Sequence, residues 1–298
     1  MTSSPNPPQD SSSPLSPADF VQSLETWKNA SNISSEEKAS RIIAAERILN
    51  CYDQKGTSLD ISASTLPEIL TELPNLSSLV TLTKLDLSDN QFTQANLQGL
   101  VALKALDLSN NELTQVNLEG LVALTELWLS GNELTQVNLQ DLIALKTLAL
   151  NSNELTQLNL HGLVALTEIQ LGHNELTELN LAGLVALEEL FVSNNHLTQI
   201  NFQGLVGLRK LHLANNQLTQ IDLQGLVALT ELWLNNNQFT SFADITLPEP
   251  STLGSIHLKN NPFAPSTAGT ITMRIPSKVI IWEMPKNTLS QYGVEIIP

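Results

Sequence analysis

An asparagine recurs every 21 residues through the middle of the chain. It stands at Asn90, Asn111, Asn132, Asn153, Asn174, Asn195, Asn216 and Asn237. The same frame surrounds each one, as in Leu103-Lys-Ala-Leu106-Asp-Leu108-Ser-Asn-Asn111, and a ninth copy follows at Leu253 to Phe263 after an insertion of three residues. Such a period indicates a repeat architecture, because one short unit cannot bury its apolar side chains alone and stacked units build a continuous core.

The frame Leu-x-x-Leu-x-Leu-x-x-Asn is the leucine-rich-repeat pattern. Its period of two predicts a short strand in each copy, with Leu85 and Leu87 pointing inward. Lys84, Asp86 and Ser88 are then expected to point outward. Stacked copies place these strands in parallel, about 4.8 Å apart. The sequence therefore predicts an α/β repeat fold, a leucine-rich-repeat solenoid or horseshoe with a parallel concave β-sheet.

The segment that returns from each strand to the next is too short for a regular helix, so we predict turns and short 3-10 pieces. Glycine recurs there, at Gly99, Gly120, Gly162, Gly183, Gly204 and Gly225. Asp141 takes the place of glycine in one copy, which indicates that a positive φ is not required at this position. The asparagine column is predicted to be structural, since a carboxamide both donates to and accepts from backbone groups of a turn.

Two amphipathic helices are predicted ahead of the repeats, within residues 16–58. Ser16-Pro17 begins the first, and the capping box Ser34-Ser-Glu-Glu37 begins the second. The predicted buried side chains are Phe20, Leu24 and Trp27 in the first helix, and Ala39, Ile42, Ala45 and Leu49 in the second. These helices are interpreted as a cap on the open end of the solenoid core.

The other predicted regions follow from composition and repeat boundaries. Residues 1–15 are polar and are predicted to be disordered. Residues 59–263 form the repeat domain, with a degenerate first repeat and then nine repeats. Residues 264–298 leave the repeat pattern and are predicted to form a small β-like C-terminal cap, such as a hairpin.

The formal charge of −16 limits the class of partner. Nucleic acid requires a basic surface, so we expect no nucleic-acid partner. No stretch is long and apolar enough to span a bilayer, and we expect no membrane partner. Self-repulsion favours a monomer, and a basic partner is the alternative interpretation of this charge.

The segment before the repeats carries a more particular pattern. It consists of Trp27, Glu37, Ala45, Arg47, Ile48, Leu49 and Cys51, then Leu59-Asp-Ile61, Leu66-Pro67 and Leu73-Pro74. This pattern resembles the N-terminal helical cap of leucine-rich-repeat effectors that Gram-negative bacteria deliver by type III secretion. Some members of that family carry a ubiquitin-ligase domain after the repeats, and others consist of repeats only and act as scaffolds. The repeats here read Asn-Leu-x-Gly-Leu where the effectors usually have paired prolines. In this they are similar to repeats of chlamydia-like bacteria and, somewhat, to a phosphatase-regulating family of eukaryotes.

No catalytic, cofactor-binding or metal-binding residues are predicted. Cys51-Tyr52-Asp53 has the Cys-x-Asp form of the ligase motif, but it precedes the repeats, and only 35 residues follow the last repeat. Cys51 is therefore predicted to be a buried structural cysteine. The five histidines lie in different coils, without the spacing of metal ligands.

The outward position in the middle of each strand varies while the frame stays fixed. It reads Asp86, Asp107, Trp128, Ala149, Gln170, Phe191, His212, Trp233 and His257. Exposed aromatic rings rimmed by charge are typical of protein interfaces. The predicted partner-binding residues are Trp128, Phe191, His212, Trp233, Glu189, Lys210, Glu231 and Arg209. The acidic end, Asp86 and Asp107, is expected to suit a basic segment.

The sequence thus favours a non-enzymatic binding scaffold with a protein partner. The resemblance implies an effector that engages a host protein through its concave face. It also implies secretion without a signal peptide, since the N-terminus lacks the apolar segment of one. Residence in the bacterial cytoplasm is the alternative. Two further hypotheses stay open: regulation of an enzyme such as a phosphatase, and a remnant of a leucine-rich-repeat ubiquitin ligase.

Overall fold

The computed structural model describes residues 15–249, 251–265, 273–276, 279–282, 289–291 and 294–297. The disorder predicted for residues 1–15 falls almost wholly outside these ranges. The chain divides into two compact units, residues 1–124 and 125–298. Each unit is built from stacked coils of the repeat, and each is described by itself.

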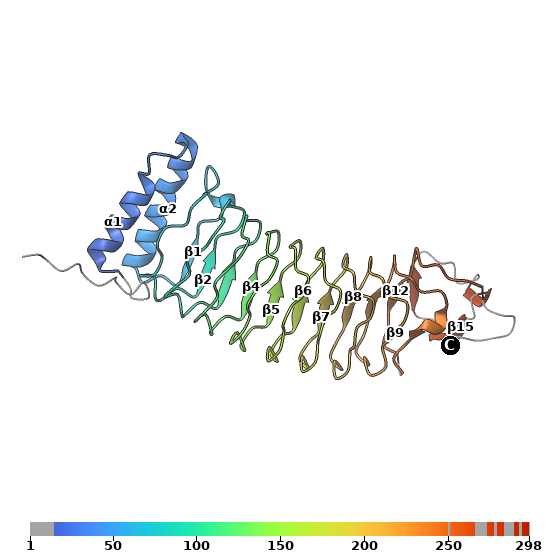
Figure 1. Ribbon diagram of the computed structural model, residues 1–298. Coiled ribbons are helices and arrows are strands. Elements are labelled where there is room, and N and C mark those ends of the chain that lie inside the picture. The colour runs from blue at the N-terminus through green and yellow to red at the C-terminus, as the bar shows by residue number, and fades with distance from the viewer. Residues whose placement is uncertain are drawn as a thin grey trace, which may run out of the picture. The chain divides into compact units, whose positions relative to one another are not determined.

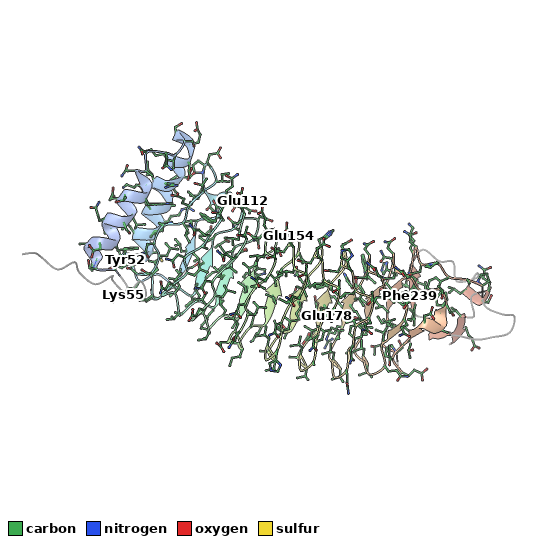
Figure 2. The ribbon with its side chains drawn as sticks, viewed as in Figure 1. Tyr52, Lys55, Glu112, Glu154, Glu178 and Phe239 are labelled. Carbon is green, nitrogen blue, oxygen red and sulfur yellow. The ribbon has the colours of Figure 1, made fainter. Side chains whose placement is uncertain are left out.

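The first unit begins with two helices, α1 (Pro17–Lys28) and α2 (Ser35–Asp53), that pack against each other (Figure 1). The predicted serine caps are confirmed, because the Ser16 and Ser34 hydroxyls accept backbone N–H groups at 3.2 and 2.9 Å. The capping box is only half formed, since the Glu37 carboxylate bonds Arg41 and Thr71 and not the Ser34 N–H. Phe20 and Leu24 are fully buried, as expected. The Phe20 ring lies 4.7 Å from the ring of Tyr52. Tyr52 lies near the end of α2 (Figure 2).

The predicted buried stripe of α2 is wrong for three of its four residues. Ala45 is buried, but Ala39 and Ile42 are exposed and Leu49 is only half-buried. The buried face instead carries Glu37, Ser40, Arg41, Ala44, Ile48 and Cys51. Pattern reasoning assigned the charged residues to solvent, whereas the fold buries an ion pair.

The strands of the first unit form a parallel sheet in the order β1 (Ser58–Asp60), β2 (Lys84–Asp86) and β3 (Ala105–Asp107). A 3-10 turn, η1 (Ala63–Thr65), follows β1. Helix α2 contacts β1, so the helices cover the first coil. Leu85 and Leu87 point into the core, and Lys84 is exposed, as the alternation predicts.

The second unit is built from the same kind of coil, with one short strand per turn. All strands of its main sheet run parallel, in the order β4 (Glu126–Trp128), β5 (Thr147–Ala149), β6 (Glu168–Gln170), β7 (Glu189–Phe191), β8 (Lys210–His212), β10 (Glu231–Trp233), β12 (Ser255–His257) and β14 (Ile280–Trp282). The central leucine or isoleucine of each strand faces the core and is buried, as Leu148 and Ile169 show. This arrangement is the predicted leucine-rich-repeat solenoid with a parallel sheet.

The end of the second unit differs from the predicted hairpin. Strand β14 pairs in parallel with β12, with Ile281 opposite Ile256, so it adds to the main sheet. Strands β13 (Met273–Pro276) and β15 (Val294–Ile297) also pair in parallel. On the returning side, β9 (Ile221–Asp222) pairs with β11 (Ile245–Thr246), which follows the 3-10 turn η2 (Phe242–Asp244). A hairpin would need antiparallel pairing, and each of these pairs is parallel because it joins equivalent points of successive turns.

The asparagine column holds neighbouring coils together. Asn174 Nδ2 donates to the Leu171 carbonyl of its own coil at 3.1 Å and to the Leu150 carbonyl of the preceding coil at 2.9 Å. Its Oδ1 accepts the Leu155 N–H at 3.1 Å. The predicted structural role is confirmed: each carboxamide bonds backbone groups that the packed leucines keep from water.

The interpretation of Asp141 is wrong. Its φ is +69°, in the same left-handed region as the glycines at this position, for example Gly183 at +87°. The turn therefore imposes a positive φ in the coils that carry Gly99 to Gly225, and Asp141 adopts it because aspartate tolerates that region better than most residues with a side chain.

Asp141→Gly is expected to stabilise the protein by roughly 0.5–1 kcal/mol, because glycine adopts positive φ without steric cost. Gly183→Ala should destabilise it by about 1–2 kcal/mol. A Cβ at Gly183 would meet nothing within 4 Å, so backbone strain alone is tested. Urea unfolding of both variants measures the effects, and a destabilised Asp141→Gly variant would contradict the account.

Candidate functional site

Four aromatic side chains stack across adjacent strands on the open face of the second unit's sheet, the face opposite the leucine core. Phe191, His212, Trp233 and His257 are in register on β7, β8, β10 and β12. The ring centroids of successive pairs lie 4.7, 4.6 and 4.4 Å apart. The first pair is perpendicular at 90°, and the other two are stacked at 22° and 27°. We call these four side chains the aromatic ladder; the repeat places them there because each follows a buried leucine or, for His257, the buried Ile256 by one residue.

A row of charged side chains runs beside the aromatic ladder, two residues earlier in each strand. It consists of Glu168, Glu189, Lys210 and Glu231, on β6, β7, β8 and β10. Lys210 Nζ pairs with Glu189 at 2.8 Å. Glu231 Oε1 accepts the Trp233 indole N–H at 2.7 Å and lies 3.1 Å from His212 Nε2. The charged row therefore fixes the orientation of two rings of the ladder before any partner arrives.

The structure brings together six of the eight predicted binding residues and separates two. Phe191, His212 and Trp233 stack, and Glu189, Lys210 and Glu231 flank them. Trp128 lies on β4, three strands from Phe191, and outside the ladder. Arg209 precedes β8 at the edge of the sheet, where its Nε lies 3.6 Å from a Glu188 carboxylate oxygen and both side chains are exposed.

Sequence reasoning left His257 out of the predicted set, although it stacks on Trp233. The signal was present in the repeat frame, because His257 occupies the same strand position as Trp233. Because of the residues inserted before the last repeat, His257 follows Trp233 by 24 residues, whereas Trp233 follows His212 by 21. The register of β12 on β10 restores the column.

The acidic end of the column lies in the first unit. The Asp86 carboxylate accepts the Ser88 N–H at 3.1 Å, and the Asp107 carboxylate accepts the Ser109 N–H at 2.9 Å. Burial raises the pKa of the Asp107 carboxyl, and the neighbouring charges of Asp86 and Asp89 raise it further. The hydrogen bond from the Ser109 backbone lowers it, but burial has the larger effect. These carboxylates are engaged with their own strands, so the aromatic ladder is the stronger candidate site.

Burial among the rings lowers the pKa of His212, and the charges of His257 and Lys210 add to this effect. The Glu231 carboxylate opposes it by accepting a hydrogen bond. His212 is therefore held neutral in the folded protein at neutral pH.

His212 is expected to titrate below the ordinary histidine value of about 6.5, as NMR of its ring protons would measure. The folded state then binds fewer protons than the unfolded state between the two pKa values, so the unfolding free energy falls as pH falls through this range. His212→Phe should lose less stability between pH values of about 7.5 and 5.5, which bracket that value. A titration midpoint above the ordinary value would contradict the account.

Charge is distributed unevenly around the second unit. Within residues 125–263, the strands and their flanks carry Lys146, Arg209, Lys210 and Lys259 with Glu126, Glu168, Glu188, Glu189 and Glu231. The returning segments carry Glu133, Asp141, Glu154, Glu175, Glu178, Asp222, Asp244 and Glu249, and no Lys or Arg. Glu154, for example, lies at the edge of the coils (Figure 2). The sheet side is thus close to neutral, and the returning side is acidic.

Cys51 is buried, with its Sγ 3.8 Å from the Ser58 carbonyl oxygen, as predicted for a structural cysteine. Burial raises the pKa of its thiol. Among the described residues, no group of three histidine, cysteine or acidic side chains could hold a metal ion. No helix in the described part of the chain is long and apolar enough to cross a membrane.

Comparison with known proteins agrees with this geometry. Two models of leucine-rich repeats match residues 80–134 and 206–247. The fold is similar to YopM, a leucine-rich effector protein from Yersinia pestis (25% identity, TM-score 0.71, covering 90% of this chain and 72% of that one). It is also similar to a leucine-rich-repeat protein of Leptospira interrogans (22%, 0.64, 95% and 81%) and to InlJ of Listeria monocytogenes (20%, 0.58, 85% and 69%). No curated protein matches the sequence significantly. These findings show the leucine-rich-repeat fold, which this chain shares with bacterial leucine-rich-repeat proteins.

Proposed function

We propose that this protein is a binding scaffold whose protein partner docks on the aromatic ladder. The observation that carries the proposal is the stack of four rings on a sheet face where they fill no core. Aromatic side chains held rigid by their neighbours lose little conformational freedom on binding, and they dominate the energetics of protein interfaces. The acidic returning side favours docking on the sheet side, since it repels copies of this acidic chain and acidic partners.

The scaffold is proposed to act without catalysis. The single cysteine is buried in the first unit, and a thiol whose pKa is raised is a poor nucleophile at neutral pH. This supports a binding role for the chain over a ligase remnant.

The finer proposal is that the scaffold is a bacterial effector that reaches a host cell by a route independent of a signal peptide. Its support is the likeness in fold to the Yersinia effector YopM, together with the two helices ahead of the repeats. A reporter enzyme fused after residue 58 and expressed in a bacterium with a type III system tests it. Reporter activity inside co-cultured host cells that needs an intact secretion system would support the route, and activity confined to the bacteria would refute it.

Phe191→Ala combined with Trp233→Ala is expected to abolish partner capture from host lysate, with Kd raised by at least about 100-fold, because interface aromatics contribute about 2 kcal/mol or more each. The unfolding free energy should fall by roughly 1.5–4.5 kcal/mol, the contribution of three ring contacts. Capture followed by mass spectrometry measures binding, and urea unfolding measures stability.

Trp128→Ala is the matched control, since it removes an aromatic side chain from the same face but outside the ladder. It should leave capture intact. Equal capture by the double variant and the wild type would refute the ladder as the binding site.

A further inference from the structure

We propose that the aromatic ladder binds an amphipathic α-helix of the partner, apolar along one face and basic along the flank beside the charged row. This inference rests on the proposed function and adds to it the conformation and chemistry of the bound segment.

The ladder offers ring edges, and not ring faces, to a partner. Both faces of the Trp233 ring are covered, by His212 at 4.6 Å and by His257 at 4.4 Å. A cation therefore finds no free face on Trp233, which rules out recognition of the aromatic-cage type at this ring. Two of the polar ring atoms, Trp233 Nε1 and His212 Nε2, are engaged with Glu231. What remains is a continuous, mainly apolar ridge, and apolar side chains are its natural partners.

The neighbouring outward positions make the ridge accessible from one side. Ser193 and Ala214 follow the rings on β7 and β8, and Gly172 stands at the same position one coil earlier. These side chains are short, whereas Asn235 and Lys259 stand at this position on β10 and β12. The low strip therefore lies beside the Phe191 and His212 half of the ladder. A rounded element can then rest on the ridge and the low strip beside it.

The spacing of the rings favours a helix over an extended chain. Successive centroids are 4.4–4.7 Å apart, and the ladder runs across the strands. A helix presents one apolar side chain per turn of about 5.4 Å. Over the three intervals of the ladder, its side chains fall out of register with the rings by only about 2–3 Å, which flexible Leu or Met side chains can span. An extended chain presents same-side residues about 6.6–6.8 Å apart, so over the same three intervals its side chains fall out of register with the rings by about 6–7 Å.

The net charge of the row beside the ladder decides which side chains are favoured on the flank of the bound helix that faces it. Lys210 is neutralised by Glu189, which leaves Glu168 and Glu231 as the net charge of the row. Among the described residues, the Glu168 carboxylate accepts a hydrogen bond only from the neutral Gln170 amide, at 2.6 Å. The two carboxylates stand three strands apart, roughly 14 Å, which corresponds to about nine residues of helix. Basic residues two or three turns apart on one flank would reach both.

A randomised display library of 20-residue peptides, with no native partner needed, tests the inference. It is selected in parallel on the wild type, on the Phe191→Ala/Trp233→Ala variant and on Trp128→Ala. Peptides enriched by the wild type and by Trp128→Ala, but not by the double variant, are expected to carry apolar residues at i, i+3 or i+4, and i+7, and a positive net charge. A central proline should weaken such a peptide at least tenfold in fluorescence anisotropy, and so should Glu168→Lys combined with Glu231→Lys.

Ladder-dependent peptides that are proline-tolerant, extended or acidic would overturn the helix while leaving the proposed binding site intact. Equal enrichment on the wild type and the double variant overturns the inference. If partner capture also survives in that variant, the proposed function falls with it.

Discussion

Arg41→Ala is expected to destabilise the first unit by about 3–5 kcal/mol, because it leaves a buried carboxylate without its charged partner. The Arg41 side chain is fully buried, and its guanidinium donates to Glu37 at 2.8 and 3.0 Å and to the Trp27 carbonyl at 2.9 Å. It also lies over the Trp27 ring, 5.1 Å from the centroid. One side chain thus joins both helices. Urea unfolding monitored by hydrogen exchange of α1 and α2 measures the loss.

The loss of stability in Arg41→Ala should come from the buried Glu37 carboxylate that is left without its charged partner. A double variant tests this. Burial alone would raise the pKa of Glu37, but bonds from Thr71 and Arg41 outweigh that effect and lower it. Arg41→Met combined with Glu37→Gln should therefore be less destabilising than Arg41→Ala, since no charge is left buried. A loss below about 1 kcal/mol for Arg41→Ala would place this pair among ordinary surface ion pairs.

Asn153→Ala and Asn174→Ala are each expected to cost about 1–3 kcal/mol, and together to cost about 1–3 kcal/mol more than their sum. Each variant leaves one buried N–H without its acceptor, that of Leu134 or Leu155. The Leu150 carbonyl accepts from both asparagines, at 3.1 and 2.9 Å. Each single variant leaves it one donor, and only the double variant removes both. Equilibrium unfolding of the full cycle measures the coupling.

Asn153→Ala with Asn195→Ala is the matched control for this cycle. These asparagines are two coils apart, and Asn195 donates to the Leu171 and Val192 carbonyls, not to one that Asn153 uses. The control pair should be additive within about 0.5 kcal/mol. If both pairs are additive, removing both donors from the Leu150 carbonyl has no extra cost, which would contradict the predicted coupling.

The repeat frame was enough to predict the candidate site in part. The period of two places every second strand residue on one face, so Phe191, His212 and Trp233 had to share the open face once the strands stacked in register. Their stacking could not be predicted, because ring orientation depends on side-chain rotamers and on Glu231, which bonds two of the rings. His257 was missed because an insertion shifts its number but not its place in the sheet.

The sequence by itself determined the coil, because inward leucines and a bonded asparagine at a fixed period admit one way of burying both apolar and backbone groups. Only the tertiary structure decided the rest. It buried Arg41, because the Trp27 carbonyl and the Glu72 carboxylate, from other segments, converge with Glu37 on that side chain. It gave Asp141 a positive φ, because the coil dictates the turn. It joined β14 to the main sheet, because the edge of β12 offers backbone groups that another parallel strand satisfies.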